Sequence, residues 1–317
     1  MNGVLIIDKP AGMTSHDVVG RLRRILDQRS VGHLGTLDPM ATGVLPLVVG
    51  NFTRLAQFYL SSEKCYEGTI RFGFSTDTYD AEGDATSPAQ PVSLNENELE
   101  AIAAKFRGVI EQIPPAFSAK KIKGVPAYKL ARKHKEVILK PVEVEIKEFE
   151  ILLLETDRVR FRARVGSGTY MRCVAHDMGQ LLGCGAHLES LRRTAVSEFT
   201  LEDTHTLDEL AAAAGESDAA RTSDKPSHRS PDRPDGTSEI AAEYFVHPRK
   251  LLPQFPSVTA DEGTAARIRA GRAVNLPDLS RARQIKVFAG QTELIAIATR
   301  IAGTLFHPKL VLCNSQQ

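Results

Sequence analysis

An aspartate in a glycine-rich loop is the strongest candidate for chemistry in this sequence. The stretch from Gly32 to Leu45 reads GHLGTLDPMATGVL, and it places Asp38 between glycine-punctuated turns and an apolar run. A carboxylate fixed in this way lies at the edge of a hydrophobic core. Asp-Pro is also a common way to begin a turn. The residues alone therefore mark Asp38 as a candidate reactive carboxylate and leave a purely structural role open.

Arg172 and Tyr66 are two further side chains that could accompany such a carboxylate, although the residues alone favour a core role for Tyr66. A carboxylate in a dry pocket tends to take up a proton unless a cation lies beside it. Arg172 stands near the start of a predicted helix, where a cation opposes the helix dipole, so ordinary helix composition does not account for it. Tyr66 lies on the apolar face of a predicted strand, so its ring should point inward with its hydroxyl near a polar site. A surface arginine and a core tyrosine are the alternatives.

The elements that must position these residues follow from the spacing of apolar side chains. Strands are predicted at residues 3–8, 43–50, 64–74, 141–147, 149–155 and 157–165, and helices from Thr14 or Ser15 onward and over 170–182. The first strand ends at Lys9-Pro10, because proline stops the ladder. Strands and helices do not alternate as βαβ units. The predicted class is therefore α+β, with a central mixed, largely antiparallel sheet.

The composition divides the chain into two predicted domains. A catalytic domain at 1–252 carries a segment at 215–240 that is rich in Ser, Asp, Arg, Pro and Gly, and we expect this insertion to be disordered. A small β-rich domain at 253–317 follows. It has a short helix at 263–270 and apolar runs at 284–289, 293–301 and 309–313.

Charge is clustered although the formal net charge is only +1. Between Ala101 and Lys135 there are nine basic residues and one acidic residue. Arginines alternate with apolar residues from Arg158 to Val165, which predicts a strand with one arginine face. Basic faces on a nearly neutral chain suit a polyanion bound in one groove, and solvated surface is the alternative.

Several classes of protein are not favoured by the composition. No apolar run approaches the ~20 residues of a membrane span, and the N-terminus does not resemble a signal peptide, so we expect a cytoplasmic protein. The four cysteines, Cys65, Cys173, Cys184 and Cys313, form no metal-binding spacing and are predicted to be reduced thiols. Neither a GxxxxGK[ST] nor a GxGxxG loop is present, which argues against a nucleotide-dependent enzyme.

The motif around Asp38 resembles the catalytic motif of the TruB family of pseudouridine synthases. Further segments resemble the same family in the same order. They are D-K-P-x-G-x-T-S from Asp8, K-x-Y from Lys64, T-D-T-x-D-x-x-G from Thr76, P-P-x-x-S-A-x-K from Pro114, G-S-G-T-Y-M-R from Gly166 and L-R-R-T from Leu191. The resemblance covers roughly residues 3–200, and the tail resembles, more loosely, the PUA-like RNA-binding domain that ends these enzymes.

The resemblance implies site-specific isomerisation of uridine to pseudouridine in the T-loop of tRNA, at position 55, without cofactor or metal. Asp38 would be the catalytic carboxylate, acting as nucleophile or as base. Arg172 would pair with it, and Tyr66 would stack on the target base and take part in a late proton transfer. Tyr170 and Leu191 would complete the uracil pocket.

The resemblance also implies how the RNA is held. The target uridine must be turned out of its stack. His33 resembles the family histidine that occupies the space left by flipped nucleotides, and Lys9 and Lys121 are candidate phosphate contacts. The T-arm of tRNA is the implied partner. We expect no obligate protein partner, and a monomer is the default.

Three alternatives remain open from the residues. A non-catalytic RNA-binding or chaperone protein would keep the basic faces without needing Asp38, Tyr66 and Arg172 together. A glycosidase would need a second carboxylate, but Asp77 and Asp80 lie in a turn-like segment that favours structural hydrogen bonding. A relative guided by a separate RNA would share the same core motifs.

Overall fold

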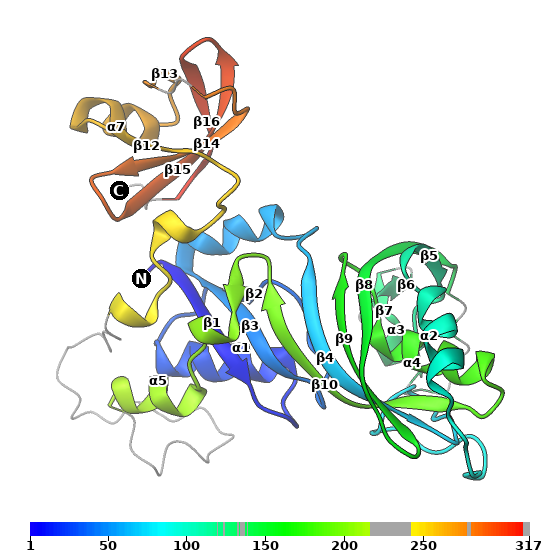
Figure 1. The fold of residues 1–317 in the computed structure, drawn as a ribbon. Coiled ribbons are helices and arrows are strands. Elements are labelled where there is room, and N and C mark those ends of the chain that lie inside the picture. The colour runs from blue at the N-terminus through cyan, green and yellow to red at the C-terminus, as the bar shows by residue number, and fades with distance from the viewer. Residues whose placement is uncertain are drawn as a thin grey trace.

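Two β-sheets organise the chain, and the smaller one stands above one end of the larger (Figure 1). The computed structural model describes residues 1–118, 120–122, 124–131, 133, 137, 139–215, 242–277 and 280–312. The predicted disordered insertion at 215–240 lies, beyond Gly215, outside the described residues.

The larger sheet has nine strands, with the path β1-β3-β10-β4-β9-β8-β5 and with β2 and β11 paired to β3 and β10. Its strands are β1 (Gly3–Lys9), β2 (Val31–His33), β3 (Thr42–Val49), β4 (Lys64–Phe72), β5 (Gly108–Gln112), β8 (Val142–Leu154), β9 (Arg158–Val165), β10 (Ala186–Val196) and β11 (Phe199–Thr200). Among these named strands only β3 and β10 pair in parallel. The prediction of a largely antiparallel sheet in an α+β fold is confirmed.

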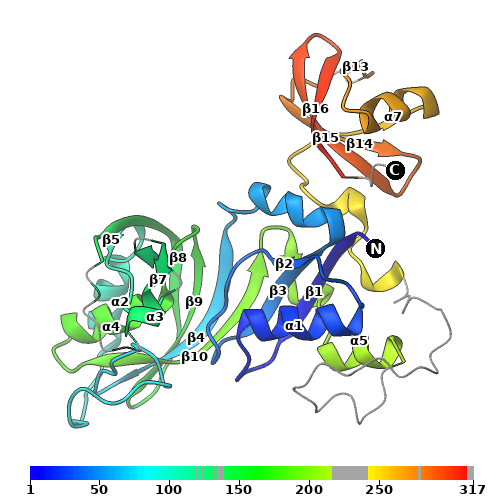
Figure 2. The same ribbon diagram turned by 180° about the vertical axis from the view of Figure 1, so that it is seen from behind.

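Helices cover one face of this sheet. They are α1 (Ser15–Ile25), α2 (Glu96–Ala104), α3 (Ala127–Ala131), α4 (Met171–Leu181) and α5 (Leu207–Ala213), and a small hairpin, β6 (Lys121–Ile122) with β7 (Val125–Pro126), lies beside α3. Figure 2 shows α1 and α5 in front of the sheet, and α2 and α4 at its far end. Thr14 caps α1 through a reciprocal hydrogen-bond box with Asp17, as a Thr-x-x-Asp sequence favours. The buried side chains of α1, α2, α4 and α5 share one hydrophobic cluster with the sheet.

Strand β1 is buried on both faces, which explains its unbroken apolar run. Leu5 and Ile7 pack in the cluster beneath the helices, whereas Val4 and Ile6 pack on the opposite face. That opposite face is covered by the 3₁₀ helix η1 (Gly50–Phe58) and by side chains of the second sheet.

The second sheet has the order β12-β14-β15-β16-β13 and packs on α7. Its elements are β12 (Ser257–Ala260), α7 (Glu262–Arg269), β13 (Val274–Asn275), β14 (Gln284–Ala289), β15 (Glu293–Ala302) and β16 (Leu305–Val311). Its junction with the larger sheet is buried and hydrogen-bonded. Glu198 Oε1 accepts from the Tyr59 hydroxyl at 2.6 Å and from Leu252 N at 2.9 Å. The two sheets are therefore fastened to each other as well as linked by the chain.

Two sequence-based boundaries are wrong. The predicted strands at 141–147 and 149–155 are one strand, β8, because an irregularity near Lys147 exposes two successive residues and interrupts the alternation. The final strand, β16, begins at Leu305 rather than near residue 309. The predicted helix over 170–182 and the apolar face of 64–74 are confirmed by α4 and β4.

Candidate active site

Asp38 and Arg172 meet although 134 positions separate them in the chain. Arg172 Nε lies 2.8 Å from Asp38 Oδ2, and Arg172 Nη2 donates to Asp38 Oδ1 at 3.2 Å. The Arg172 side chain is only 4% exposed, whereas that of Asp38 is 34% exposed. The pair thus consists of a buried cation and a carboxylate that remains open to solvent on one side.

The remaining donors of Arg172 are occupied by two other loops. Nη1 donates to the carbonyl of Thr78 at 2.9 Å, and Nη2 donates to the carbonyl of Phe117 at 3.0 Å. Asp80 Oδ2 lies 3.5 Å from Nη1, and the Asp80 side chain is 5% exposed. Partners other than Asp38 therefore hold the Arg172 side chain in one orientation.

Arg193 fastens both ends of the segment that carries Asp38, which we call the Asp38 loop (residues 35–44). Three main-chain carbonyls accept its N–H groups: Val44 at 2.8 Å, Thr36 at 3.1 Å and Gly35 at 3.1 Å. Gly43 lies against the Arg193 backbone with φ +99°, and a Cβ there would come within 2.2 Å of the Arg193 carbonyl oxygen. Only glycine fits this contact, so β10 can press directly onto the loop.

Lys9 holds the tip of the Asp38 loop from inside the protein. Its side chain is fully buried, and Nζ donates to the carbonyls of Pro10, Met13 and Pro39. Burial lowers the pKa of Lys9 to about 8, while the negative charge of Asp38 partly opposes this shift. All three ammonium protons are used on the protein itself. This setting corrects the prediction that Lys9 contacts phosphate, because a buried lysine with three carbonyl partners has no donor left for RNA.

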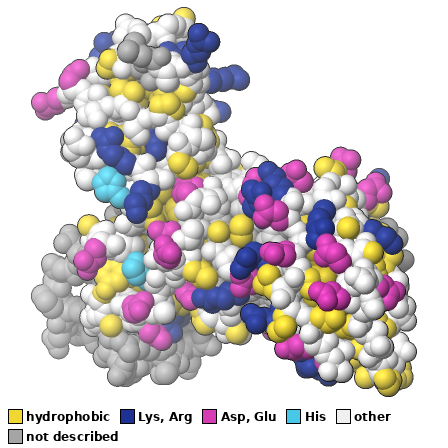
Figure 3. Space-filling model, viewed as in Figure 1, with side chains coloured by type: hydrophobic (Ala, Val, Ile, Leu, Met, Phe, Trp, Pro, Cys, Tyr) yellow, Lys and Arg dark blue, Asp and Glu magenta, His cyan; other side chains and the backbone are white. Residues whose placement is uncertain are grey.

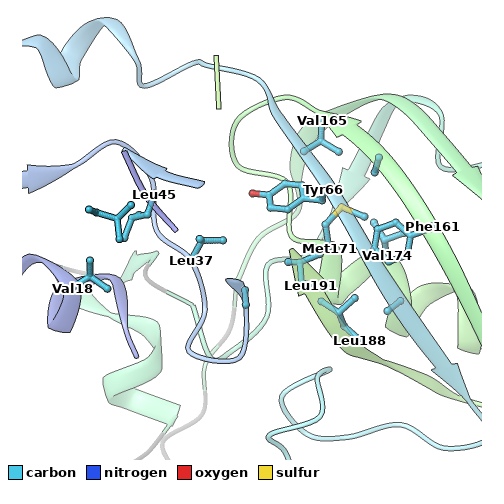
Figure 4. Close-up of a cluster of buried hydrophobic side chains, with 14 of the residues drawn as sticks. Val18, Leu37, Leu45, Tyr66, Phe161, Val165, Met171, Val174, Leu188 and Leu191 are labelled. Atoms are coloured by element: carbon cyan, nitrogen blue, oxygen red, sulfur yellow. The ribbon is translucent and has the colours of Figure 1, made fainter. Parts of the chain in front are cut away.

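Tyr66 and Leu191 line an apolar wall beside this loop. Both are buried and belong to one cluster with Leu37 and Met171, the chain neighbours of Asp38 and Arg172. In Figure 4 the hydroxyl of Tyr66 points toward Leu37, and Leu191 lies near Met171. The chain neighbours of the charged pair are therefore buried in the same hydrophobic cluster as Tyr66 and Leu191.

Tyr170 precedes α4 and is held by a buried amide. Gln112, on β5, donates from Nε2 to the Tyr170 carbonyl at 3.1 Å and accepts from Tyr170 N at 2.8 Å. Burial raises the pKa of the Tyr170 hydroxyl, so this group is a hydrogen-bonding group rather than an anion near neutral pH. Burial likewise raises the pKa of Cys173 to about 12, so that thiol is not a competing nucleophile.

His33 and Lys121 lie on short strands. His33, on β2, accepts a hydrogen bond at Nδ1 from Gly35 N at 3.3 Å. Burial chiefly, and then the charge of Arg193, lower the pKa of His33. His33 therefore favours its neutral form. Lys121 begins β6, and its side chain lies outside the described residues.

Three arginines on the arginine face of β9 are paired with carboxylates. Arg158 pairs with Glu189 at 2.9 Å, Arg162 with Glu67 at 2.9 Å, and Arg164 with Glu148 at 2.5 Å. Figure 3 shows basic and acidic side chains interspersed over this part of the molecule. The strand and its arginine face were predicted correctly, but carboxylates on β4, β8 and β10 neutralise these three arginines. Their charges are thus balanced by neighbouring strands, which favours the alternative of a solvated surface for these three side chains.

The described part of the chain offers no obvious metal site. Within it, no three His, Cys, Asp or Glu side chains are grouped to hold an ion. In the same residues no helix has both the length and the apolar character to cross a membrane.

Sequence reasoning missed three contributors to the site. Arg193 and Gln112 lie within or beside recognisable motifs, but local periodicity does not reveal that they grip backbone from distant segments. Asp80 was interpreted as a structural hydrogen-bonder, and it does accept from Thr78 Oγ1 at 2.6 Å and from Glu82 N at 3.1 Å. Its proximity to Arg172 is the additional feature that only the fold reveals.

Comparison with known proteins identifies the family. Residues 23–171 match the model of the TruB family pseudouridylate synthase N-terminal domain, and residues 172–226 match that of the tRNA pseudouridylate synthase B C-terminal domain. Curated relatives include the tRNA pseudouridine synthase B of Solibacter usitatus, 47% identical over 98% of this chain and 100% of that protein. That of Burkholderia mallei is 36% identical over 99% of this chain and 98% of that protein.

Solved structures agree on the fold. A Cbf5-Nop10-Gar1 complex matches with a TM-score of 0.67 at 24% identity, over 98% of this chain and 85% of that chain. An H/ACA RNP bound to a substrate RNA containing 2'-deoxyuridine matches with a TM-score of 0.67 at 23% identity, over the same shares. The larger sheet with its helices is thus the pseudouridine synthase fold, and the curled second sheet is PUA-like. By sequence and by fold, the chain belongs to the TruB family of pseudouridylate synthases.

Proposed function

We propose that this chain converts the uridine at position 55 in the T-loop of tRNA into pseudouridine, with Asp38 as the reactive carboxylate. The observation that carries the proposal is the pairing of the partly exposed Asp38 with the buried Arg172. Family membership supports the reaction, and curated relatives named tRNA pseudouridine synthase B support tRNA as the substrate.

The reaction breaks the bond between uracil N1 and ribose C1′, turns the base, and joins C5 to C1′. Asp38 can serve as the nucleophile at C1′ or as the base that removes a ribose proton. In either role it must be ionised, and the guanidinium of Arg172 stabilises the carboxylate. The proton that leaves C5 must be removed at the end, and we propose that Tyr66 takes part in this step. The proposal requires no cofactor or metal.

The apolar wall supports the placement of the base. We propose that Tyr66 stacks on the flipped uracil and that Tyr170 and Leu191 complete its pocket. The burial of Tyr66 and Leu191 in one hydrophobic cluster with Leu37 supports this arrangement. An apolar pocket excludes water and strengthens the electrostatic interactions within it.

Other segments are proposed to hold the T-arm. His33 would occupy space vacated by the flipped nucleotide, and Lys121 would contact phosphate. Lys9 is instead proposed to stabilise the Asp38 loop. We further propose a catalytic domain at 1–252 and an RNA-binding domain at 253–317, the PUA-like sheet gripping the tRNA away from the T-loop.

Tritium release from tRNA labelled with 5-³H-uridine tests the proposal. The purified chain alone should release a single equivalent per tRNA, and none from a tRNA carrying cytidine at position 55. Asp38→Asn should slow release at least about a thousandfold while retaining tRNA binding. Asp84→Asn, an exposed loop aspartate, is the matched control and should act like the wild type.

Each failure has a distinct meaning. Full activity of Asp38→Asn would move the chemistry to another carboxylate. Release from the cytidine-55 tRNA would remove the site assignment. Binding without any release by the wild type would refute catalysis by the single chain.

A further inference from the structure

Helix α4 grips one short turn through two side chains that lie one helical turn apart. Arg172 and His176 are four residues apart, so they project from the same face of α4. Arg172 donates to the carbonyl of Thr78 and lies 3.5 Å from the carboxylate of Asp80. His176 contacts the residue between these two, Tyr79, by ring stacking. Three successive residues of the turn are therefore held by one face of the helix.

The contact between Tyr79 and His176 is close and nearly coplanar. The ring centroids are 3.8 Å apart, and the planes differ by 17°. His176 Nδ1 is buried and makes no hydrogen bond within the described residues. Stacking rather than hydrogen bonding is thus the principal contact of this imidazole with the turn.

Tyr79 also adopts a backbone conformation that its side chain disfavours. Its φ is +65°, in the left-handed region where residues other than glycine are uncommon. The strain must be offset by other interactions. The Tyr79 carbonyl accepts from Leu188 N at 3.0 Å, and the stack on His176 holds the side chain from the other side.

We propose that His176 and Tyr79 are positioning residues: their stack holds the Thr78–Asp80 turn against Arg172, and through Arg172 it sets the orientation of the Asp38 carboxylate. Neither ring contacts Asp38 in the described hydrogen bonds and ion pairs, so both act through Arg172. The inference rests on the proposed role of Asp38. It adds to the reaction proposed above two residues that orient Arg172 and Asp38.

The test measures the rate of the chemical step separately from RNA binding. Single-turnover tritium release, with enzyme in saturating excess over labelled tRNA, gives the rate constant for product formation. Filter binding gives the Kd for the same tRNA. An aromatic pair contributes a free energy that corresponds to about a three- to tenfold change in rate. Its loss should lower the rate constant by that factor when the whole contribution serves to orient Arg172 and Asp38. The Kd should stay within about twofold, since the pair is not proposed to touch RNA.

Substitutions at His176 give the first comparison. His176→Ala removes the ring and should show the full loss, whereas His176→Phe keeps a stacking ring and should restore the rate. The matched control is His205→Ala, which removes another histidine–tyrosine contact, with Tyr244 at 4.9 Å in an edge-on arrangement. His205 lies outside the proposed site, so this variant should keep the wild-type rate.

Substitutions at Tyr79 separate stacking from backbone strain. Tyr79→Phe should be active. Tyr79→Gly relieves the strain but lacks the ring, so it should remain as slow as Tyr79→Ala. The double variant Tyr79→Ala/His176→Ala should be no slower than either single variant, because both remove the same contact.

Four outcomes would overturn the inference. They are a wild-type rate for His176→Ala, no rescue by His176→Phe, restoration by Tyr79→Gly, or a change in Kd with no change in the saturated rate. Asp38→Asn, measured in parallel, keeps the two proposals separate. If it is fully active, the proposed function fails; if it is inactive and His176→Ala is normal, only the positioning role fails.

Discussion

Replacing Arg193 by methionine is expected to release both ends of the Asp38 loop. Arg193 is 1% exposed, and its guanidinium donates to three main-chain carbonyls at 2.8–3.1 Å. Each hydrogen bond from a charged donor contributes about 1.5–3 kcal/mol, and a carbonyl left buried without a donor carries its own cost. Removing the buried cation recovers part of its desolvation penalty. The expected net loss is about 3–5 kcal/mol, a large share of the 5–15 kcal/mol typical of a folded protein.

The adjacent residue provides a matched control on the same strand. Arg192 forms a two-pronged ion pair with Asp8 at 2.7 and 3.1 Å, and its side chain is 42% exposed. An exposed ion pair contributes about 1 kcal/mol or less. Arg192→Met should therefore cost far less than Arg193→Met, although the substitution is chemically the same. Arg193→Lys should lie between them, because an ammonium cannot reproduce the planar fork.

Urea unfolding followed by far-ultraviolet circular dichroism measures the three stabilities, and single-turnover tritium release measures the loop's effect on chemistry. Under conditions in which both variants are folded, the single-turnover rate of Arg193→Met should be lower than that of Arg192→Met by about tenfold or more. The reason is that a displaced Asp38 carboxylate is no longer aligned with the substrate. Equal losses of stability in the two methionine variants, together with equal rates, would refute the assignment of Arg193 as the fastener of the loop.

Two further predictions concern buried charges near Asp38. Asp80→Asn keeps the shape of the turn but removes a negative charge 3.5 Å from Arg172, so the single-turnover rate should fall about tenfold or more. Asp77→Asn, in the same loop but exposed, is its control, and equal rates for the two variants would contradict the role of Asp80. For Lys9, the folded-state pKa of about 8 lies below the ordinary value of 10.5, so the unfolded chain binds more protons between these values and stability rises with pH there. The unfolding free energy of the wild type relative to Lys9→Met should rise by up to about 3 kcal/mol from pH 8 to 10.5, and a flat difference in urea titrations would show that Lys9 does not titrate in this way.

Local structure around the site could be predicted because its causes lie within a few residues. The apolar stripe and the Thr14 cap specify α1, and the alternation through Tyr66 specifies the buried face of β4. The same reasoning failed in β8, where the irregularity near Lys147 shifts the two-residue period by one. A pattern that depends on strict alternation divides such a strand into two.

The residue types of the candidate site were also evident from the sequence, through a motif that places Asp38 in a glycine-punctuated loop and through the resemblance that singled out Arg172 and Tyr66. Periodicity could assign each to a face of its own element. It could not show that Arg172 contacts Asp38, which lies 134 positions away in the chain, since that contact depends on how the strands pair.

Only the tertiary structure decided which charged groups are available to a substrate. Sequence favours a lysine or arginine at the surface, because burying a charge is costly unless it finds partners. Lys9 finds such partners in Pro39 and two nearer carbonyls, and Arg193 finds them across the Asp38 loop. Arg162 lies at the surface, but Glu67 of the neighbouring strand neutralises it. The sequence determined which residues could do chemistry and the local elements that carry them, whereas strand pairing decided which charges face one another, because partners so distant in the chain leave no local pattern.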